Sequence, residues 1–285
     1  MRPSISSFPN QSFYAGALRD ADSVSTRPPP LKSTYFGAPS ALAAMPSPPR
    51  SPSSPSAAAG QHEPVAFVSH AGPETVHRQS LLNRTESNIL ISIVGDLLRH
   101  NPTLRATDIG IISPYYAQTR LLVNTFESGY AASRLRTLLG AQRAAEAGEV
   151  EVNTVDGFQG REKRVVLLST VRSNLGGYIG FLTDRRRLNV ALTRAKDALI
   201  VVGNERTLRK AAGVIRSRDL DIGRDDVWDD EDGGPALRVR APVRKGDPDA
   251  DPSVWTRFLD WCARRGLVRQ FEEEEGASAS TARRA

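Results

Sequence analysis

Short apolar runs alternate with longer amphipathic stretches between residue 63 and about residue 213. The apolar runs are rich in Val, Ile and Leu and lie at residues 65–68, 108–113, 150–154, 165–170 and 198–202. Runs of this length, bounded by polar or turn residues, are typical of strands that are buried on both faces. The pattern therefore predicts five strands of a buried sheet.

The stretches between these runs have helical spacing. Ile89, Ile93 and Leu97, each with an apolar neighbour, repeat at three- and four-residue intervals, and Thr85 is the expected N-cap. Further helices are expected over residues 116–127, 131–147 and 184–197. Strands that alternate with helices favour a parallel sheet covered on both faces. The fold class predicted for residues 63–215 is therefore α/β, a doubly wound parallel sheet.

The segments around this body have a different composition. Residues 27–62 are rich in Pro, Ser and Ala, which predicts a disordered insertion or, alternatively, a Pro-rich ligand for a partner domain. Residues 216–252 are charged and predict a loop. Aromatic residues at helical spacing predict one short docking helix within 253–271, and residues 272–285 are expected to be a disordered tail.

Composition limits the class of protein. A chain of 285 residues with 39% hydrophobic residues can form one well-packed core with unstructured additions. The net charge of +6 suits an anionic partner such as nucleic acid, although a solvated basic surface gives the same value. The single cysteine, Cys262, excludes an intrachain disulfide and a cysteine-based metal site.

The same composition bears on location. The chain has no apolar run that approaches the 18 residues of a membrane span and no secretory signal near Met1. We therefore expect an intracellular protein, cytoplasmic or nuclear, without membrane contact.

Polar residues gather at three junctions between predicted elements. These are residues 113–118, residues 153–162 and residues 184–196. In open parallel sheets, ligands bind beyond the carboxyl ends of the strands, where the first two junctions lie. We therefore expect one site assembled from several loops.

Arginines in the third junction need anionic partners. Arg185, Arg186 and Arg187 stand at the positive end of the predicted helix, where either Asp184 as N-cap or a bound phosphate would compensate them. Arg194 follows in a small and apolar stretch. Its five donors require a carboxylate or a phosphate, and local context alone favours a structural salt bridge.

Three runs of residues then show a family resemblance. Residues 111–115 with Gln118, residues 151–163 and residues 180–196 are similar to motifs IV, V and VI of superfamily 1 helicases. They most resemble the group that contains the nonsense-mediated mRNA decay helicase and senataxin. The resemblance covers about residues 79–204 and, more thinly, 1–20. It implies a RecA-like helicase C-terminal domain, the second of the two lobes of the motor.

The resemblance also implies a nucleotide site. Arg194 matches the arginine finger that reaches the γ-phosphate of ATP from across the cleft. Gly160, Arg161 and Glu162 match the nucleotide-contacting part of motif V. The implied cofactor is ATP with Mg²⁺, held mainly by the N-terminal lobe.

A nucleic-acid track is implied as well. Thr154 and Asp156 match positions that link the track to the nucleotide site. Ser113, Pro114 and Tyr115 match the edge of motif IV near the bound strand. The implied partner is single-stranded RNA or DNA.

The sequence lacks the motifs of the other lobe. It contains neither the Gly-x-x-x-x-Gly-Lys-Ser/Thr run of Walker A nor a Walker B acid. Met1 to Ile5 resemble the end of a family motif, so residues 1–26 are interpreted as an N-terminal remnant of the helicase core in a truncated chain. We expect the chain alone to be inactive and to work with an N-terminal RecA-like lobe, upstream or in trans. The alternative is a catalytically inactive nucleic-acid-binding or scaffold module with the same fold.

Overall fold

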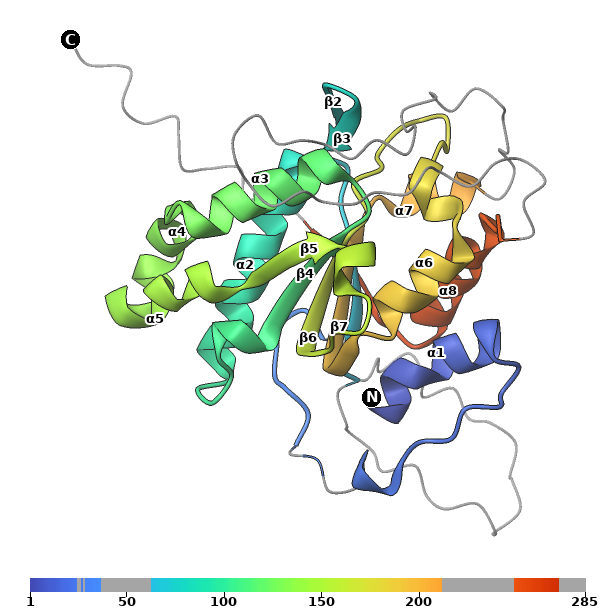
Figure 1. Ribbon diagram of the computed structural model, residues 1–285, viewed down its shortest axis with the longest axis horizontal. Helices are drawn as coiled ribbons and strands as arrows, with labels where there is room; N and C mark the ends of the chain where they lie inside the picture. Colours follow the sequence, from blue (N-terminus) through green and yellow to red (C-terminus); the bar gives the residue numbers. More distant parts are fainter. Residues whose placement is uncertain (25–26, 28, 37–62, 212–248, 272–285) are drawn as a thin grey trace.

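A computed structural model describes residues 1–24, 27, 29–36, 63–211 and 249–271 (Figure 1). Six parallel strands form the main sheet, in the order β5-β4-β6-β7-β1-β8. The predicted doubly wound parallel α/β sheet is confirmed, and it is consistent with a RecA-like fold. The predictions for residues 37–62, 216–248 and 272–285 lie outside the described residues.

All five predicted strands are present. The strands of the sheet are β1 (Val65–Ser69), β4 (Ile109–Ser113), β5 (Glu151–Thr154), β6 (Lys163–Ser169), β7 (Ala195–Gly203) and β8 (Val268–Gln270). β8 was not predicted, because a three-residue strand at a sheet edge shows little periodicity. Successive residues of the inner strands enter opposite cores: Phe67 packs in one and Val68 in the other.

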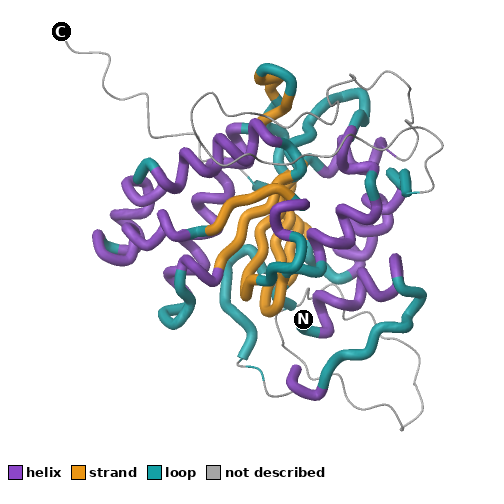
Figure 2. Tube along the Cα trace, viewed as in Figure 1, coloured by secondary structure: helices purple, strands orange, loops and turns teal. Residues whose placement is uncertain are grey.

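Helices cover both faces of this sheet (Figures 1 and 2). On one face lie α2 (Arg84–His100), α3 (Tyr116–Glu127), α4 (Tyr130–Leu139) and α5 (Ala141–Ala145). On the other lie α1 (Pro3–Phe13), α6 (Arg185–Leu192), α7 (Glu205–Lys210) and α8 (Ser253–Arg264). Within the part of the chain that the structure describes, none of these helices is long and apolar enough to cross a membrane.

Three helix boundaries differ from the prediction. α2 is capped by Asn83, whose side chain accepts from the amide of Glu86, so the choice of Thr85 was wrong. The helix expected over 131–147 breaks at Gly140, where a φ of 78° stops α4, and α5 and a 3₁₀ turn over Glu146–Glu149 follow. The helix expected over 184–197 ends at Leu192, because β7 begins at Ala195.

A hairpin and the helices α1 and α7 also went unpredicted. β2 (Thr75–His77) and β3 (Ser80–Leu82) form an antiparallel hairpin that precedes α2. α1 packs through Phe8, whose ring lies 5.0 Å from that of Phe258 and 5.9 Å from that of Trp261. The N-terminal segment is thereby part of the core formed with α8.

Part of the predicted insertion is ordered. Residues 29–36 lie against α2, with Leu31 and Phe36 buried. The hydroxyl of Ser33 donates to Asp96 of α2 at 2.6 Å. The expectation of disorder over 27–62 is therefore wrong for this part, because two large apolar side chains and local hydrogen bonds offset the ordering entropy that the Pro-rich composition suggested.

Candidate functional site

The predicted site residues separate into two clusters at opposite ends of the sheet. Glu162 and Arg194 directly precede β6 and β7, at the amino ends of the strands, whereas Ser113 and Thr154 end β4 and β5 at the carboxyl ends. The expectation of one site beyond the carboxyl ends was therefore wrong. We call Gly160, Arg161, Glu162 and Arg194 the amino-end cluster, and Ser113, Pro114, Tyr115, Thr154 and Asp156 the carboxyl-end cluster.

Residues 155–162, the crossing loop, connect the two clusters. β4 lies between β5 and β6, so the loop that joins β5 to β6 has to pass over β4. It does so at Gly110, where a Cβ atom would lie 2.7 Å from Cζ of Phe158 and 2.9 Å from Cγ of Lys163. Phe158 is fully buried there. The absence of a side chain at position 110 is what lets the loop lie this close to the sheet.

We expect Gly110→Ala to lower the free energy of unfolding by about 1 to 3 kcal/mol, because the new methyl group overpacks the Phe158 ring. Urea titration of the 285-residue chain measures this change. Gly148→Ala is the matched control, since a Cβ there meets its nearest atom at 3.5 Å. Phe158→Leu added to Gly110→Ala is expected to recover part of the loss. An unchanged unfolding midpoint for Gly110→Ala contradicts the packing argument.

Arg194 is held by neutral oxygens. Its Nε donates to the carbonyl of Val190 at 3.1 Å, its Nη2 to Oγ1 of Thr193 at 3.1 Å, and its Nη1 to the carbonyl of Arg161 at 3.4 Å. No described carboxylate lies within ion-pairing distance of it. Its guanidinium therefore lies beside the loop that carries Glu162, with its charge uncompensated by the described residues.

Neighbouring cations differ from Arg194 in this respect. Arg187 pairs with Asp156 at 3.2 Å and Asp184 at 3.7 Å, and Arg186 pairs with Asp249 at 2.8 Å. Asp184 is the N-cap of α6, accepting from the amides of Arg186 and Arg187. The two alternatives for this junction were Asp184 as N-cap and a bound phosphate. Carboxylates compensate the charges of Arg186 and Arg187, so these two residues require no phosphate.

The rest of the amino-end cluster is open to solvent. Gly160 has a φ of 80°, a conformation that favours glycine, and a Cβ there would meet no atom within 4 Å. The exposed Arg161 pairs with Glu151, and Glu162 pairs with Lys196 at 3.2 Å. The backbone amide of Lys163 donates to the carbonyl of Arg194 at 3.1 Å. This last bond joins the two segments of the cluster directly.

Most of the carboxyl-end cluster is buried. Ser113, Pro114, Tyr115 and Thr154 are inaccessible or nearly so. The Tyr115 hydroxyl donates to the carbonyl of Ile179 at 2.9 Å, and burial raises the pKa of this phenol. Oγ1 of Thr154 accepts from the amide of Gly157 at 3.1 Å. These side chains make internal contacts that shape the edge of the sheet, and their contact with a bound strand stays a prediction.

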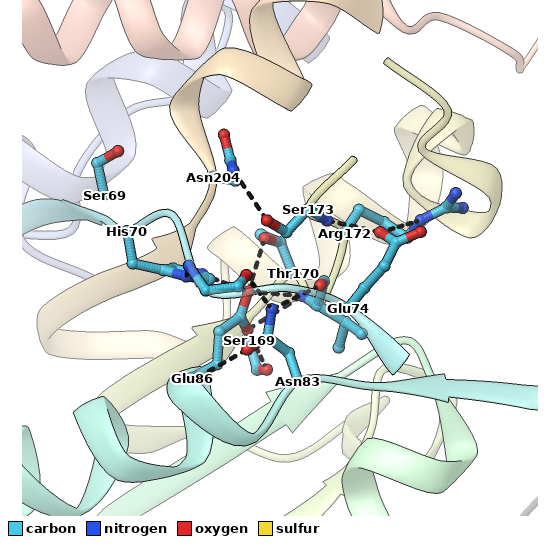
Figure 3. A network of polar contacts seen from close by, with 12 residues as sticks. Ser69, His70, Glu74, Asn83, Glu86, Ser169, Thr170, Arg172, Ser173 and Asn204 are labelled. Atoms are coloured by element: carbon cyan, nitrogen blue, oxygen red, sulfur yellow. Dashed lines mark hydrogen bonds and ion pairs between the residues drawn. The ribbon is translucent and has the colours of Figure 1, made fainter. Parts of the chain in front are cut away.

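A buried polar network at the same edge was missed by sequence reasoning (Figure 3). The Glu86 carboxylate is fully buried and accepts from Nε2 of His70 at 3.1 Å, from the amide of Val171 at 2.9 Å and from the hydroxyl of Ser169. Nδ1 of His70 accepts from the amide of Gly72, which assigns the ring proton to Nε2. The spacing of Asn83 and Glu86, a capping pattern at the start of α2, was the available signal.

This network fixes the start of the loop that follows β6. Val171 has a φ of 69°, an outlier for a β-branched residue. The adjoining Arg172 is buried, pairs with Glu74 at 3.1 Å and donates to the Tyr115 hydroxyl at 3.2 Å. Figure 3 shows His70, Glu86 and Ser169 converging from the end of β1, from α2 and from the end of β6. Such strain persists where the surrounding structure determines it, and it is common at functional edges.

Comparison with known proteins assigns this chain to a family. The model of a family described as an AAA domain matches residues 1–206. The chain is 36% identical over 212 residues to a regulator of nonsense transcripts 1 homolog of Neurospora crassa. The match covers 74% of this chain and 16% of that protein.

Helicases are among the other relatives. The identity is 35% over 214 residues to the ATP-dependent helicase upf1 of Schizosaccharomyces pombe, covering 74% of this chain and 20% of that protein. The identity to the helicase sen1 of the same organism is 32% over 210 residues. This match covers 73% of this chain and 10% of that protein. The chain thus spans a fifth or less of the length of these relatives. It belongs to the AAA-domain family, as a superfamily 1 helicase domain of the nonsense-mediated decay and senataxin type.

Proposed function

We propose that this chain is the second RecA-like lobe of an ATP-dependent nucleic-acid helicase, and that Arg194 is its arginine finger. The observation that carries the proposal is the contrast among the cations of residues 184–196, which form α6 and the start of β7. Arg186, Arg187 and Lys196 each have a described carboxylate partner, whereas Arg194 has only neutral oxygens. A partly exposed guanidinium held in place without a counter-charge is suited to an incoming phosphate.

The described residues fit one side of a bound ATP. The uncompensated charge of Arg194 suits the γ-phosphate, and Gly160, Arg161 and Glu162 form an open loop beside it. When bound, ATP with Mg²⁺ supplies the phosphoryl group that is transferred to water. Within the described ranges, no group of three or more His, Cys, Asp or Glu side chains could hold a metal ion. In this proposal the metal and the remaining phosphates are held by an N-terminal lobe, upstream or in trans, because the sequence contains neither the Walker A nor the Walker B groups.

The carboxyl-end cluster is proposed to line the track for single-stranded RNA or DNA. Its buried members, Ser113 and Thr154, would act by holding the backbone of the edge, and Asp156 would link this edge to the crossing loop. Closure of the cleft at one end of the sheet would then move a strand bound at the other. Both RNA and DNA are compatible with a cytoplasmic or nuclear location, which stays a prediction.

The experiment is an ATPase measurement on two proteins. We expect the purified 285-residue chain to show no turnover, with or without single-stranded RNA, because the Walker A and Walker B groups are absent from its sequence. A fusion that joins a Walker A-bearing RecA-like lobe of a superfamily 1 helicase in front of Met1 is expected to hydrolyse ATP, and faster with single-stranded RNA or DNA.

Each result has a defined meaning. Turnover by the chain alone contradicts the two-lobe proposal. If the fusion binds ATP through its Walker A lobe but single-stranded RNA or DNA does not increase its ATP hydrolysis, the alternative of an inactive binding or scaffold module is supported. Strand affinity measured on the 285-residue chain by fluorescence anisotropy separates a binding module from a scaffold.

A further inference from the structure

The strand that follows Arg194 begins with an irregularity. β7 advances three residues, from Ala195 to Ala198, while the paired β6 advances two, from Lys163 to Val165. One extra residue therefore lies in β7 within this interval, and Lys196 and Asp197 together oppose Arg164. Such a bulge breaks the ladder locally and redirects the neighbouring side chains, and it is common next to active sites.

Groups from outside the sheet satisfy the backbone of this bulge. The carbonyl of Lys196 accepts from the amide of Arg2 at 3.0 Å and from Nη1 of Arg27 at 2.9 Å. Figure 1 shows the N-terminus beside the amino ends of β6 and β7, in agreement with the first of these bonds. The N-terminal segment thus takes the place of a ladder partner.

Asp197 joins these groups in one cluster. Its carboxylate has only 7% of its surface exposed. It lies 3.0 Å from Nη1 of Arg27, 3.0 Å from Nε of Arg164 and 3.5 Å from Nε of Arg2. Burial alone would raise the pKa of this carboxyl, but the hydrogen bonds from Arg164 and Arg27 hold it below its ordinary value. Asp197 therefore ties the two inner strands and the N-terminal segment together three residues after Arg194.

We propose that Asp197 is a positioning residue for Arg194: with its three arginines it holds the bulge, and the bulge sets the direction in which the Arg194 side chain leaves the start of β7. This inference rests on the proposed function. The mechanical link is short, because the carbonyl of Arg194 itself accepts from Lys163, the residue before Arg164. Loss of the Asp197 charge would release both strands at the point where they carry the amino-end cluster.

The test is Asp197→Asn in the two-lobe fusion. We expect kcat for ATP to fall about 10- to 100-fold, the effect of misplacing a catalytic group by about 1 Å. The affinity for ADP is expected to stay at the parental value, because ADP lacks the γ-phosphate that Arg194 would contact. Asp197→Glu restores the charge and is expected to regain part of kcat. A merely destabilised variant would instead lower the urea midpoint of the 285-residue chain, which the ADP affinity, set mainly by the N-terminal lobe, does not report.

A second readout uses the 285-residue chain itself. The amide of Lys163 donates to the carbonyl of Arg194, so Asp197→Asn is expected to speed hydrogen exchange at this amide relative to the other β6 amides. Asp260→Asn removes another arginine pair, with Arg209 at 2.6 Å, and is the control expected to leave both kcat and the Lys163 exchange unchanged.

The outcomes separate the two proposals. A parental rate for Arg194→Ala in the fusion refutes the arginine finger, and the positioning role with it. A slow Arg194→Ala together with a parental rate for Asp197→Asn refutes the positioning role alone. If Asp197→Asn does not fold, Arg27→Met decides: a lower kcat at unchanged ADP affinity supports the role, and a parental kcat overturns it.

Discussion

Replacing Arg194 by Ala in the two-lobe fusion is expected to lower the ATPase rate by about 10³- to 10⁵-fold, the range measured for arginine fingers. The physical reason is that phosphoryl transfer develops charge on the oxygens of the γ-phosphate, and a preorganised cation neutralises it. Arg194 is preorganised by hydrogen bonds to Val190 and Thr193. Steady-state hydrolysis in saturating single-stranded RNA measures the effect.

The binding of the strand serves as the internal control for this variant. Arg194 lies at the amino ends of the strands, away from the carboxyl-end cluster, so the dissociation constant for single-stranded RNA is expected to change little. Arg194→Lys is expected to stay slow, because an ammonium group cannot reproduce the planar fork of donors. Arg99→Ala, at an exposed arginine in the last turn of α2, is the matched control. Hydrolysis by Arg194→Ala at the parental rate would rule out the finger role.

Glu86→Ala is expected to lower the free energy of unfolding by about 3 to 5 kcal/mol, because several buried donors lose their acceptor at once. Nε2 of His70, the amide of Val171 and the hydroxyl of Ser169 all point at this carboxylate. Chemical denaturation of the 285-residue chain, followed by circular dichroism, measures the change.

Two companion variants give the Glu86 result its meaning. Glu86→Gln keeps the shape and one acceptor, so a smaller loss is expected. Glu127→Ala removes an exposed glutamate at the end of α3 and is expected to change stability little. If Glu86→Ala and Glu127→Ala unfold at the same denaturant concentration, the network does not hold the edge of the sheet.

The fold class was predictable because burial on both faces leaves a direct trace in sequence. Each central strand places alternate residues in different cores, so runs such as 165–168 are apolar throughout. Helix ends were harder. Thr85 and Asn83 are both acceptable caps, and only the position of Glu86 in the buried network decides between them. The end of α6 depends on where β6 pairs with β7, a long-range contact that local spacing does not contain.

The residues of the candidate site come from the motif resemblance and stay a prediction, whereas their arrangement in space was not predicted. Motif resemblance brought together Ser113, Thr154, Glu162 and Arg194, and the structure places them at both ends of the sheet. The strand order decides this, since β4 lies between β5 and β6. The contacts of Asp197 with Arg2 and Arg27 could not be foreseen either, because they join residues at least 170 positions apart in the chain.

The route of the crossing loop has a consequence for timing in a working motor. Asp156 lies near one end of the loop and Glu162 at the other, and the buried Phe158 ring anchors the middle. In the proposed motor this loop would pivot about the buried ring, so a strand that displaced Asp156 would also displace Glu162. Release of the strand and release of the spent nucleotide would then be linked through a single short segment, without any change in the sheet beneath it.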